Sequence, residues 1–449
     1  MEKISLKKIA EWCGVETILE GFVEKISTDS REIDAETLFV ALKGERFDAN
    51  DFVPDVLNKG AKAVVCSKYE GNDERVILVE DTGKALLDIA AGYRQNFNIP
   101  FVALTGSVGK TTTKGMIYAV LSEKFNTLRT EGNLNNEIGV PKTLFRLENS
   151  HEAAVIEMGM NHFGEISRLS KTVCPDIGVI TNVGTAHIEN LGSRNGILKA
   201  KSEILDGMKA GSPLVINGDS DILNKVQADD YKVIRFGLDG GDVTAENIDP
   251  TSLGSGFTVK YKEQSERAFV PSQGIHNVYN GLCAIAVGLL LGMTLDECVR
   301  GLRNFAPEGM RQKITSVKGM TFIEDCYNAN LDSMCAALET LKSLKIRRTV
   351  AVLGDMLELG DFSKEAHQRV GEKAFETECA LVVTFGDAAE EIAKAFIESG
   401  GVAKAFKDKT ELTNYLRENL KEGDTVLFKG SRGMKMEEIF TSLYKEWEV

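Results

Sequence analysis

The sequence predicts an α/β protein built from three domains, and three observations support this prediction. The chain has 449 residues, and at about 100–200 residues per domain this length suggests three domains, with two or four as alternatives. Short apolar runs alternate with helical patterns, as in parallel sheets that are covered by helices. Breaks at residues 98–100 and near residues 307–312 divide the chain into the ranges 1–98, 99–310 and 311–449.

Short apolar runs mark the expected strands of each range. In the first range, strands are expected at 37–42, 63–66 and 76–79, before a helix at 84–97. In the second range, runs typical of buried parallel strands lie at 101–105, 153–157, 177–181 and 213–217. Residues 231–270 resemble antiparallel strands, and helices are expected at 276–292 and 295–304. The third range, with strands expected at 321–324, 349–353, 380–384 and 425–428, again indicates an open α/β sheet.

The composition limits the classes of function. Apolar residues make up 43% of the chain and charged residues 27%, as in ordinary globular proteins. The formal net charge of -14 argues against a nucleic-acid partner, because such proteins neutralise phosphates with Lys and Arg. It still allows a local basic pocket for a small anionic substrate.

The cysteines and apolar segments indicate the cellular compartment. The eight cysteines contain no CxxC pair and mostly stand beside apolar residues, so we expect reduced, buried thiols. The N-terminus is too polar for a signal peptide, and the apolar stretch at 284–291 is too short to cross a bilayer. We therefore expect a cytoplasmic protein without membrane insertion, and a monomer.

A phosphate-binding loop is the strongest local signal. The segment Thr105-Gly-Ser-Val-Gly-Lys-Thr-Thr-Thr113 follows an expected strand and precedes an expected helix, which is the context that such a loop needs. Its backbone N–H groups would cradle phosphate oxygens. Lys110 would reach the outer phosphates, and Thr111 or Thr112 would help to hold magnesium. The alternative, a glycine turn with a chance lysine, is disfavoured by this context.

Three further residues are candidates for the chemistry. Glu157 ends a buried strand, where a carboxylate points into the crevice in which α/β sheets bind ligands, and it could hold magnesium. His187 lies just past another strand end, and Lys201 lies in an expected helix. The residues alone leave a structural histidine, a surface glutamate and a surface lysine open as alternatives.

Several blocks together resemble the Mur ligase family over essentially the whole chain. Besides the phosphate loop, they are Gly132-Asn-Leu-Asn-Asn-Glu-Ile-Gly-Val-Pro141, Glu157-Met-Gly-Met-Asn161, Thr181-Asn-Val-Gly-Thr-Ala-His187, Gly274-Ile-His-Asn-Val-Tyr-Asn280, Asp325-Cys-Tyr-Asn-Ala-Asn330, Leu353-Gly-Asp-Met-Leu-Glu-Leu-Gly360 and Lys429-Gly-Ser-Arg-Gly-Met434. Two of these blocks, at 157–161 and 327–330, resemble the branch that adds D-alanyl-D-alanine. Two departures are Leu331, where the family usually has Pro, and Ser202, where a Gly usually follows the lysine.

The resemblance implies a role for each range. The first would be a UDP-substrate-binding α/β domain, the second a P-loop ATPase-like domain with a parallel sheet, and the third a Rossmann-like α/β domain that binds the incoming dipeptide and part of ATP. The implied ATP-binding residues are Thr105, Gly106, Ser107, Val108, Gly109, Lys110, Thr111, Thr112, Asn280, Arg311, Asp325 and Asn328. The implied UDP-substrate residues are Ser27, Asp29, Ser30, Arg31, Lys43 and Gly44, and the implied acceptor residues are Asn328 and Asn330.

The resemblance also implies the reaction. ATP would phosphorylate the carboxylate of UDP-N-acetylmuramoyl-tripeptide, and the amine of D-alanyl-D-alanine would attack the acyl phosphate to give an amide. Catalytic roles are implied for Lys110, Glu157, His187 and Lys201. Magnesium would be held by Thr111, Glu157, His187 and Lys201, with Lys201 carbamoylated by carbon dioxide. The third residue of the peptide, lysine or diaminopimelate, stays open.

Two other functions could also use a phosphate-binding loop on an α/β scaffold. A sister ligase with another acceptor would use the same scaffold, but the Asp-Asn-Pro-Arg motif of the ligases that add diaminopimelate does not occur in this sequence. A nucleotide-dependent switch would need the Asn-Lys-x-Asp guanine motif, which is also missing. A switch would leave the polar blocks after residue 320 without a purpose.

Overall fold

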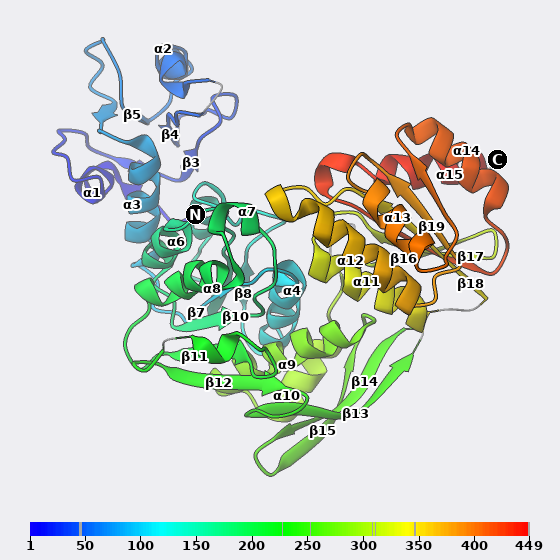
Figure 1. Cartoon of the computed structure of the whole chain (residues 1–449). Coiled ribbons are helices and arrows are strands. Elements are labelled where there is room, and N and C mark those ends of the chain that lie inside the picture. The colour runs from blue at the N-terminus through cyan, green and yellow to red at the C-terminus, as the bar shows by residue number, and fades with distance from the viewer. Residues whose placement is uncertain are drawn as a thin grey trace.

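The computed structural model describes residues 1–44, 47–226, 228–251, 253–307, 309, 311–344 and 347–447. Its strands form three main sheets that follow one another along the chain, and the N-terminal, central and C-terminal parts appear in Figure 1 in blue, cyan to green, and yellow to red. The predicted α/β class with three domains is therefore correct. None of the described helices is long and apolar enough to cross a membrane.

The N-terminal part contains a parallel four-stranded sheet. Its strands in order are β3 (Lys25–Ser27), β4 (Thr37–Val40), β5 (Ala63–Cys66) and β6 (Val76–Leu78). One face packs on α2 (Val53–Asn58), which follows the short helix η1 (Ala49–Phe52). The other face packs on α1 (Leu6–Trp12) and α3 (Thr82–Arg94), and β1 (Ile4–Ser5) pairs separately with β2 (Phe22–Val23).

Helix α3 connects this part to the central sheet. Its Tyr93 is fully buried, and the hydroxyl donates to the carbonyl of Leu147 at 2.6 Å and accepts the N–H of Glu2 at 2.7 Å. Apolar side chains of α1, α3 and the central helices belong to one continuous hydrophobic cluster. The N-terminal part therefore sits on the central part through a shared core.

The central sheet has nine strands in the order β15-β14-β13-β12-β11-β10-β7-β9-β8. The parallel strands are β7 (Phe101–Thr105), β8 (Thr127–Arg129), β9 (Ala153–Glu157), β10 (Ile177–Ile180), β11 (Pro213–Asn217) and β12 (Lys232–Gly237). The antiparallel extension adds β13 (Val243–Thr251), β14 (Gly254–Tyr261) and β15 (Gln264–Val270).

One part of the predicted strand arrangement was wrong. Residues 231–270 were expected to be antiparallel throughout, but β12 pairs in parallel with both β11 and β13. The segment between β11 and β12, which includes η3 (Leu223–Lys225), carries the chain back to the starting edge of the sheet. The strand β12 therefore runs in the same direction as β11.

Helices cover both faces of the central sheet. One face packs on α4 (Lys110–Leu121), α9 (Ile275–Leu290) and α10 (Leu295–Arg303). The other packs on α3, α5 (Gly139–Leu144), α6 (Glu165–Val173) and α8 (Arg194–Ser202). The short helices α7 (Ile188–Leu191) and η2 (Glu203–Gly207) flank α8. Buried strands with few polar residues are what a parallel sheet covered on both faces requires.

The C-terminal sheet has six strands in the order β16-β17-β21-β18-β19-β20. These are β16 (Lys313–Val317), β17 (Met320–Asp325), β18 (Arg348–Gly354), β19 (Leu381–Phe385), β20 (Ala403–Phe406) and β21 (Asp424–Lys429), and β16 alone among them pairs antiparallel. One face carries α11 (Leu331–Ser343), α12 (Ser363–Glu376) and α13 (Glu390–Glu398), and the other α14 (Lys409–Asn419) and α15 (Glu437–Trp447). The short helices η4 (Gly360–Phe362) and η5 (Arg432–Met434) follow β18 and β21.

Candidate active site

The phosphate loop joins the end of β7 to the start of α4. Gly109 caps α4 with φ of 75°, in the left-handed region that suits glycine. The side chain of Asn182, just after β10, accepts the N–H groups of Ser107 at 3.1 Å and Val108 at 2.9 Å. A Cβ on Gly106 would collide with the hydroxyl of Thr181. Close packing against the end of β10 therefore fixes the shape of the loop.

Lys110 begins α4 and faces a cavity. Its Nζ donates to the carbonyl of Gly106 at 2.9 Å, and burial lowers the pKa of its amine. The neighbouring Thr111 is buried, and Thr112 also lines the cavity. The loop thus presents one cation and the positive end of α4 to the same space, an arrangement that favours phosphate.

Glu157, the last residue of β9, is 1% exposed. Its carboxylate accepts hydrogen bonds from the hydroxyl of Thr111 at 3.0 Å and the amide of Asn135 at 2.8 Å. The Nζ of Lys114 lies 3.2 Å from Oε2. Burial acts to raise the pKa of this carboxyl, but the charges of Lys114 and Lys110 outweigh it and lower the pKa. Glu157 is therefore ionised at neutral pH.

Lys114 and Asn135 are site residues that the sequence prediction missed. Lys114 is fully buried and also donates to the carbonyl of Gly132 at 3.0 Å. Two signals could have identified them. Lys114 stands one helical turn after Lys110 on the same helix, and Asn135 belongs to a block that had been noted without a role.

His187 lines the same cavity as the phosphate loop, and the charge of Lys110 acts on both His187 and Lys201. Burial, followed by the charges of Lys110 and Lys201, lowers the pKa of His187 to about 4, so its ring is neutral at neutral pH. Its buried Nδ1 lies 3.1 Å from a carboxylate oxygen of Glu358 but forms no aligned hydrogen bond with the described residues. We therefore treat this contact as a close approach and not as an ion pair.

Lys201 lies in α8 and is 2% exposed. Burial, and then the charge of Lys110, lowers the pKa of its amine well below the ordinary value. A fully buried amine is unusual for lysine, and the lowered pKa favours the uncharged form, which is the form that reacts with carbon dioxide. The following residue, Ser202, uses its hydroxyl to bond the carbonyl of Leu198 at 2.8 Å.

A chain of amides connects the phosphate loop to the C-terminal part. The hydroxyl of Thr113 donates to Asn280 at 3.1 Å, and Asn280 donates to Asn277 at 3.1 Å. Asn277 donates to the side chain of Gln312 at 3.0 Å. The neighbouring Arg311 lies over the ring of Tyr327, with 4.1 Å between the guanidinium carbon and the ring centre. The segment that contains Arg311 and Gln312 thus contacts the central part through Asn277 and the C-terminal part through Tyr327.

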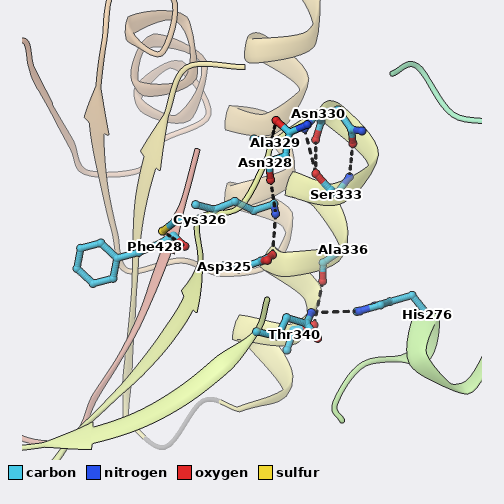
Figure 2. Close-up of polar contacts among 12 residues, drawn as sticks. His276, Asp325, Cys326, Asn328, Ala329, Asn330, Ser333, Ala336, Thr340 and Phe428 are labelled. Carbon is cyan, nitrogen blue, oxygen red and sulfur yellow. Dashed lines mark hydrogen bonds and ion pairs between the residues drawn. The ribbon is translucent and has the colours of Figure 1, made fainter. Parts of the chain in front are cut away.

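The predicted site residues of the C-terminal part gather where the chain passes from β17 to α11. Figure 2 shows Asp325, Asn328 and Asn330 at the start of α11, with His276 reaching toward this helix from the central part. The Nζ of Lys429, at the end of β21, lies 2.6 Å from Oδ2 of Asp325 and donates to the carbonyl of Asn328 at 3.2 Å. This pair fixes the loop against the sheet.

Asn330 is the N-cap of α11. Its side chain accepts the N–H of Ser333 at 2.9 Å, and the hydroxyl of Ser333 accepts the N–H of Asn330 at 3.0 Å (Figure 2). This reciprocal cap orders the turn in which Leu331 stands where the family usually has Pro. The side chain of Asn330 is therefore occupied by the helix, and its contact with the acceptor stays a prediction.

A cavity of about 470 Å³ brings most of the predicted residues together. Its lining comes from both the central and the C-terminal parts. The predicted residues in the lining are Ser107, Val108, Gly109, Lys110, Thr111, Thr112, Glu157, His187, Asn280, Arg311, Asp325, Asn328 and Asn330. Predicted residues outside the lining are Thr105, Gly106 and Lys201, together with all six residues that were assigned to the UDP-substrate.

The six UDP-substrate residues lie in the N-terminal part, at the end of β3 (Ser27) and in the loops after β3 and β4. The hydroxyl of Ser27 accepts the N–H of Asp29 at 3.0 Å, and Asp29 pairs with Arg31 at 2.6 Å. Lys59 donates to the carbonyl of Ser30 at 2.8 Å, and Lys43 lies in the second loop, before Gly44. Both loops leave the carboxyl edge of a parallel sheet, the edge at which such sheets bind ligands.

The four predicted magnesium ligands differ in how well their side chains suit this ion. Mg²⁺ prefers oxygen ligands and is commonly bound by one or two carboxylates together with substrate phosphates. Thr111 and Glu157 fit this pattern, and His187, which lines the same cavity, has a buried Nδ1 without a hydrogen-bond partner among the described residues. No cluster of three or more His, Cys, Asp or Glu side chains suited to a metal occurs within the described ranges. Lys201 would fit only as a carbamate, which supplies oxygens.

Comparisons with known proteins agree with this geometry. Family models match residues 23–94 (Mur ligase family, catalytic domain), 104–288 (Mur ligase middle domain) and 310–432 (Mur ligase, glutamate ligase domain). The UDP-N-acetylmuramoyl-tripeptide--D-alanyl-D-alanine ligase of Bacillus subtilis is 38% identical over 95% of this chain and 94% of its own. The chain therefore belongs to the Mur ligase family, as the sequence blocks had predicted.

Two solved structures are similar over nearly the whole chain. The crystal structure I of MurF from Acinetobacter baumannii has a TM-score of 0.93 and 34% identity, and covers 99% of both chains. The MurF ligase from Thermotoga maritima in complex with ADP has a TM-score of 0.86 and 30% identity, and covers 94% of this chain and 98% of that one.

The buried pair of Lys114 and Glu157 leads to a first prediction. Replacing Lys114 by Met leaves a buried carboxylate without its cation, which we expect to lower the free energy of unfolding by about 3–5 kcal/mol. Thermal unfolding of Lys114→Met, Glu157→Gln and the double variant measures this effect. The double variant should recover most of the stability, because it buries neither the carboxylate nor the ammonium. A double variant as unstable as Lys114→Met would contradict the assigned pairing.

Proposed function

We propose that this chain joins D-alanyl-D-alanine to UDP-N-acetylmuramoyl-tripeptide at the expense of ATP, in peptidoglycan synthesis. The observation that carries the proposal is the cavity between the phosphate loop and the loops of the C-terminal sheet. It is supported by curated relatives that carry this activity in their names and match at 38% identity over 95% of the chain. The chain is thus an ATP-dependent amide ligase.

The phosphate loop and three side chains around the cavity are proposed to bind ATP. The backbone N–H groups of the phosphate loop and the end of α4 bind the phosphates, and Lys110 neutralises charge on the outer ones. A relative with the same fold forms a complex with ADP, which supports nucleotide binding by this chain. Asn280 and Arg311, which both line the cavity, are proposed to contact the rest of the nucleotide.

Magnesium is proposed to be held by Thr111, Glu157, His187 and carbamoylated Lys201. Magnesium supplies charge that allows a triphosphate and a carboxylate to approach each other. Glu157 keeps its negative charge because Lys114 lowers its pKa, and His187 is neutral, so its free nitrogen can donate an electron pair. The carbamate would turn the amine of Lys201 into an anion with two oxygens.

The reaction then has two steps. The terminal carboxylate of the tripeptide attacks the γ-phosphorus of ATP, the bond to the β-phosphate oxygen breaks, and ADP leaves. The amine of D-alanyl-D-alanine next attacks the carbonyl carbon of the acyl phosphate, the amine loses its proton, and inorganic phosphate leaves. Since water would also attack an acyl phosphate, enclosure between the central and C-terminal parts protects the intermediate.

Residues of the N-terminal and C-terminal parts are proposed to bind the two substrates that are joined. Ser27, Asp29, Ser30, Arg31, Lys43 and Gly44 would hold the UDP end of the substrate in the N-terminal part. Asp325, Asn328 and Asn330 would face the nucleotide and the acceptor. We retain the domain ranges 1–98, 99–310 and 311–449, and we propose a monomer in the cytoplasm, where ATP and UDP-linked precursors are available.

The activity is tested with purified protein, ATP and magnesium. Phosphate release should require both UDP-N-acetylmuramoyl-tripeptide and D-alanyl-D-alanine, and the pentapeptide product should appear by mass. Tripeptides ending in lysine and in diaminopimelate are assayed in parallel. Lys110→Ala should lose at least about a hundredfold in rate, because one cation on the phosphates is removed. If the protein turns over only with a different amino acceptor, it is a sister ligase with another acceptor specificity.

The modification of Lys201 is tested without an activity assay. Protein equilibrated with isotope-labelled bicarbonate should show one carbamate signal by nuclear magnetic resonance, because burial lowers the pKa of the Lys201 amine. The signal should be absent from Lys201→Arg and present in Lys199→Arg, its neighbour on the same helix. An identical spectrum for the wild type and Lys201→Arg would rule out the carbamate.

A further inference from the structure

Asp332, in the first turn of α11, connects the C-terminal part to the segment that follows β10. Its Oδ2 accepts the backbone N–H of Thr185 at 2.9 Å and the hydroxyl of the same residue at 3.2 Å. Within the described ranges, no other hydrogen bond joins residues 101–303 directly to residues 313–447. A single carboxylate therefore makes both of these links between the two parts.

The carboxylate of Asp332 also packs against the backbone of Gly184. A Cβ on this glycine would lie 2.1 Å from Oδ2 and 2.7 Å from Cγ of Asp332, so a residue with a side chain would displace the carboxylate. Asp332 is partly buried, and a hydrogen bond to an ionised carboxylate is stronger than one between neutral groups. The start of α11 is thus fitted closely to residues 184 and 185.

Helix α11 does not depend on Asp332 for its cap. The side chains of Asn330 and Ser333 form the reciprocal cap of this helix with each other's backbone N–H groups. Both hydrogen bonds that the carboxylate of Asp332 accepts come instead from Thr185 in the central part. Replacing Asp332 therefore removes the link between the parts and leaves the cap in place.

The segment that receives Asp332 is also the one that holds the phosphate loop. It has no regular secondary structure, so its backbone relies on side chains for hydrogen bonds. Asn182 accepts the N–H of Ser107 at 3.1 Å, and the hydroxyl of Ser107 accepts the N–H of Gly184 at 2.9 Å. Arg194 donates to the carbonyl of Val183 at 3.0 Å. The N–H of the next residue is the one that is bonded from the C-terminal part.

The phosphate loop and α11 thus bind two adjacent N–H groups of one short segment. Without the carboxylate, the N–H of Thr185 would lack its acceptor, and the segment could relax together with Ser107. Resting on the function proposed above, we infer that Asp332 is a positioning residue that couples the docking of the C-terminal part to the shape of the phosphate loop. The loop then holds the phosphates correctly only while the part that is proposed to bind the acceptor is in place, which restricts phosphoryl transfer to an enclosed cavity.

Steady-state kinetics of Asp332→Ala test this inference. We expect kcat for pentapeptide synthesis to fall about ten- to a hundredfold, as for loss of a hydrogen bond to a charged group. The KM for the UDP-linked tripeptide should stay unchanged, because its UDP end is proposed to bind in the N-terminal part. Asp332→Asn keeps an oxygen that can accept the N–H of Thr185, so its kcat should lie between those of the wild type and Asp332→Ala. Thermal unfolding checks that both variants fold as the wild type does.

A double-mutant cycle with Ser107→Ala tests the coupling to the phosphate loop. This substitution removes the acceptor of the Gly184 N–H, and Ser107 shares no hydrogen bond with Asp332. For residues that act independently, the two losses of kcat multiply. We expect the loss in the Ser107→Ala, Asp332→Ala double variant to be at least about threefold smaller than the product, because both substitutions release the same segment.

Glu339 provides a matched control on the same helix. It is exposed, and it pairs with Lys373 of α12 at 2.5 Å, within the C-terminal part. Glu339→Ala removes one negative charge from α11 without touching the central part. Its kcat should equal that of the wild type, since exposed ion pairs contribute little.

The outcomes distinguish the inference from the function on which it rests. A wild-type protein that makes no pentapeptide would overturn both. An active wild type with an unchanged kcat in folded Asp332→Ala would overturn the inference alone. Losses that multiply in the double variant would also overturn it, since Asp332 would then act without the phosphate loop. An equal loss of kcat in Glu339→Ala would have the same consequence, because it would indicate a general effect of charge on α11.

Discussion

The compensation of the buried charge on Glu157 is the interaction on which the site depends. A carboxylate taken out of water at the end of a buried strand costs several kcal/mol unless a cation and hydrogen-bond donors surround it. Lys114 supplies the cation, and Thr111 and Asn135 supply the donors. Since Thr111 and Lys114 both belong to α4, the same contacts fix the helix that follows the phosphate loop against β9. The ionised carboxylate and the phosphate loop are thus held as one unit.

The C-terminal sheet repeats this arrangement on the other side of the cavity. Asp325 ends β17 and pairs with the buried Lys429 at the end of the adjacent strand β21. The two sheets contribute the carboxyl ends of their parallel strands to one space, where loops and helix starts present polar groups. The contact between Thr185 and Asp332, at 2.9 Å, joins the two parts directly. Nucleotide and acceptor can therefore meet between two frameworks that are joined by few direct contacts.

The sequence predicted the fold class, the family and the phosphate loop because each leaves a local signal. Apolar runs such as 101–105 identify buried strands, and glycines before Lys110 identify the loop. Short or half-exposed strands, such as β8, β16 and β20, carry too weak a pattern to be noticed. Lys114 was missed because a buried lysine looks like any helical lysine until its partner is placed in space. The direction of β12 likewise depends on how the preceding segment returns, which no local pattern records.

The central claim is that ATP activates a carboxylate at this cavity through an acyl phosphate. The most direct measurement uses UDP-N-acetylmuramoyl-tripeptide with isotope-labelled oxygen in its terminal carboxylate. In the first step one labelled oxygen becomes the bridge to phosphorus, and it leaves with the phosphate in the second. The account predicts that each molecule of released phosphate carries one labelled oxygen. Unlabelled phosphate, with product still formed, would contradict it.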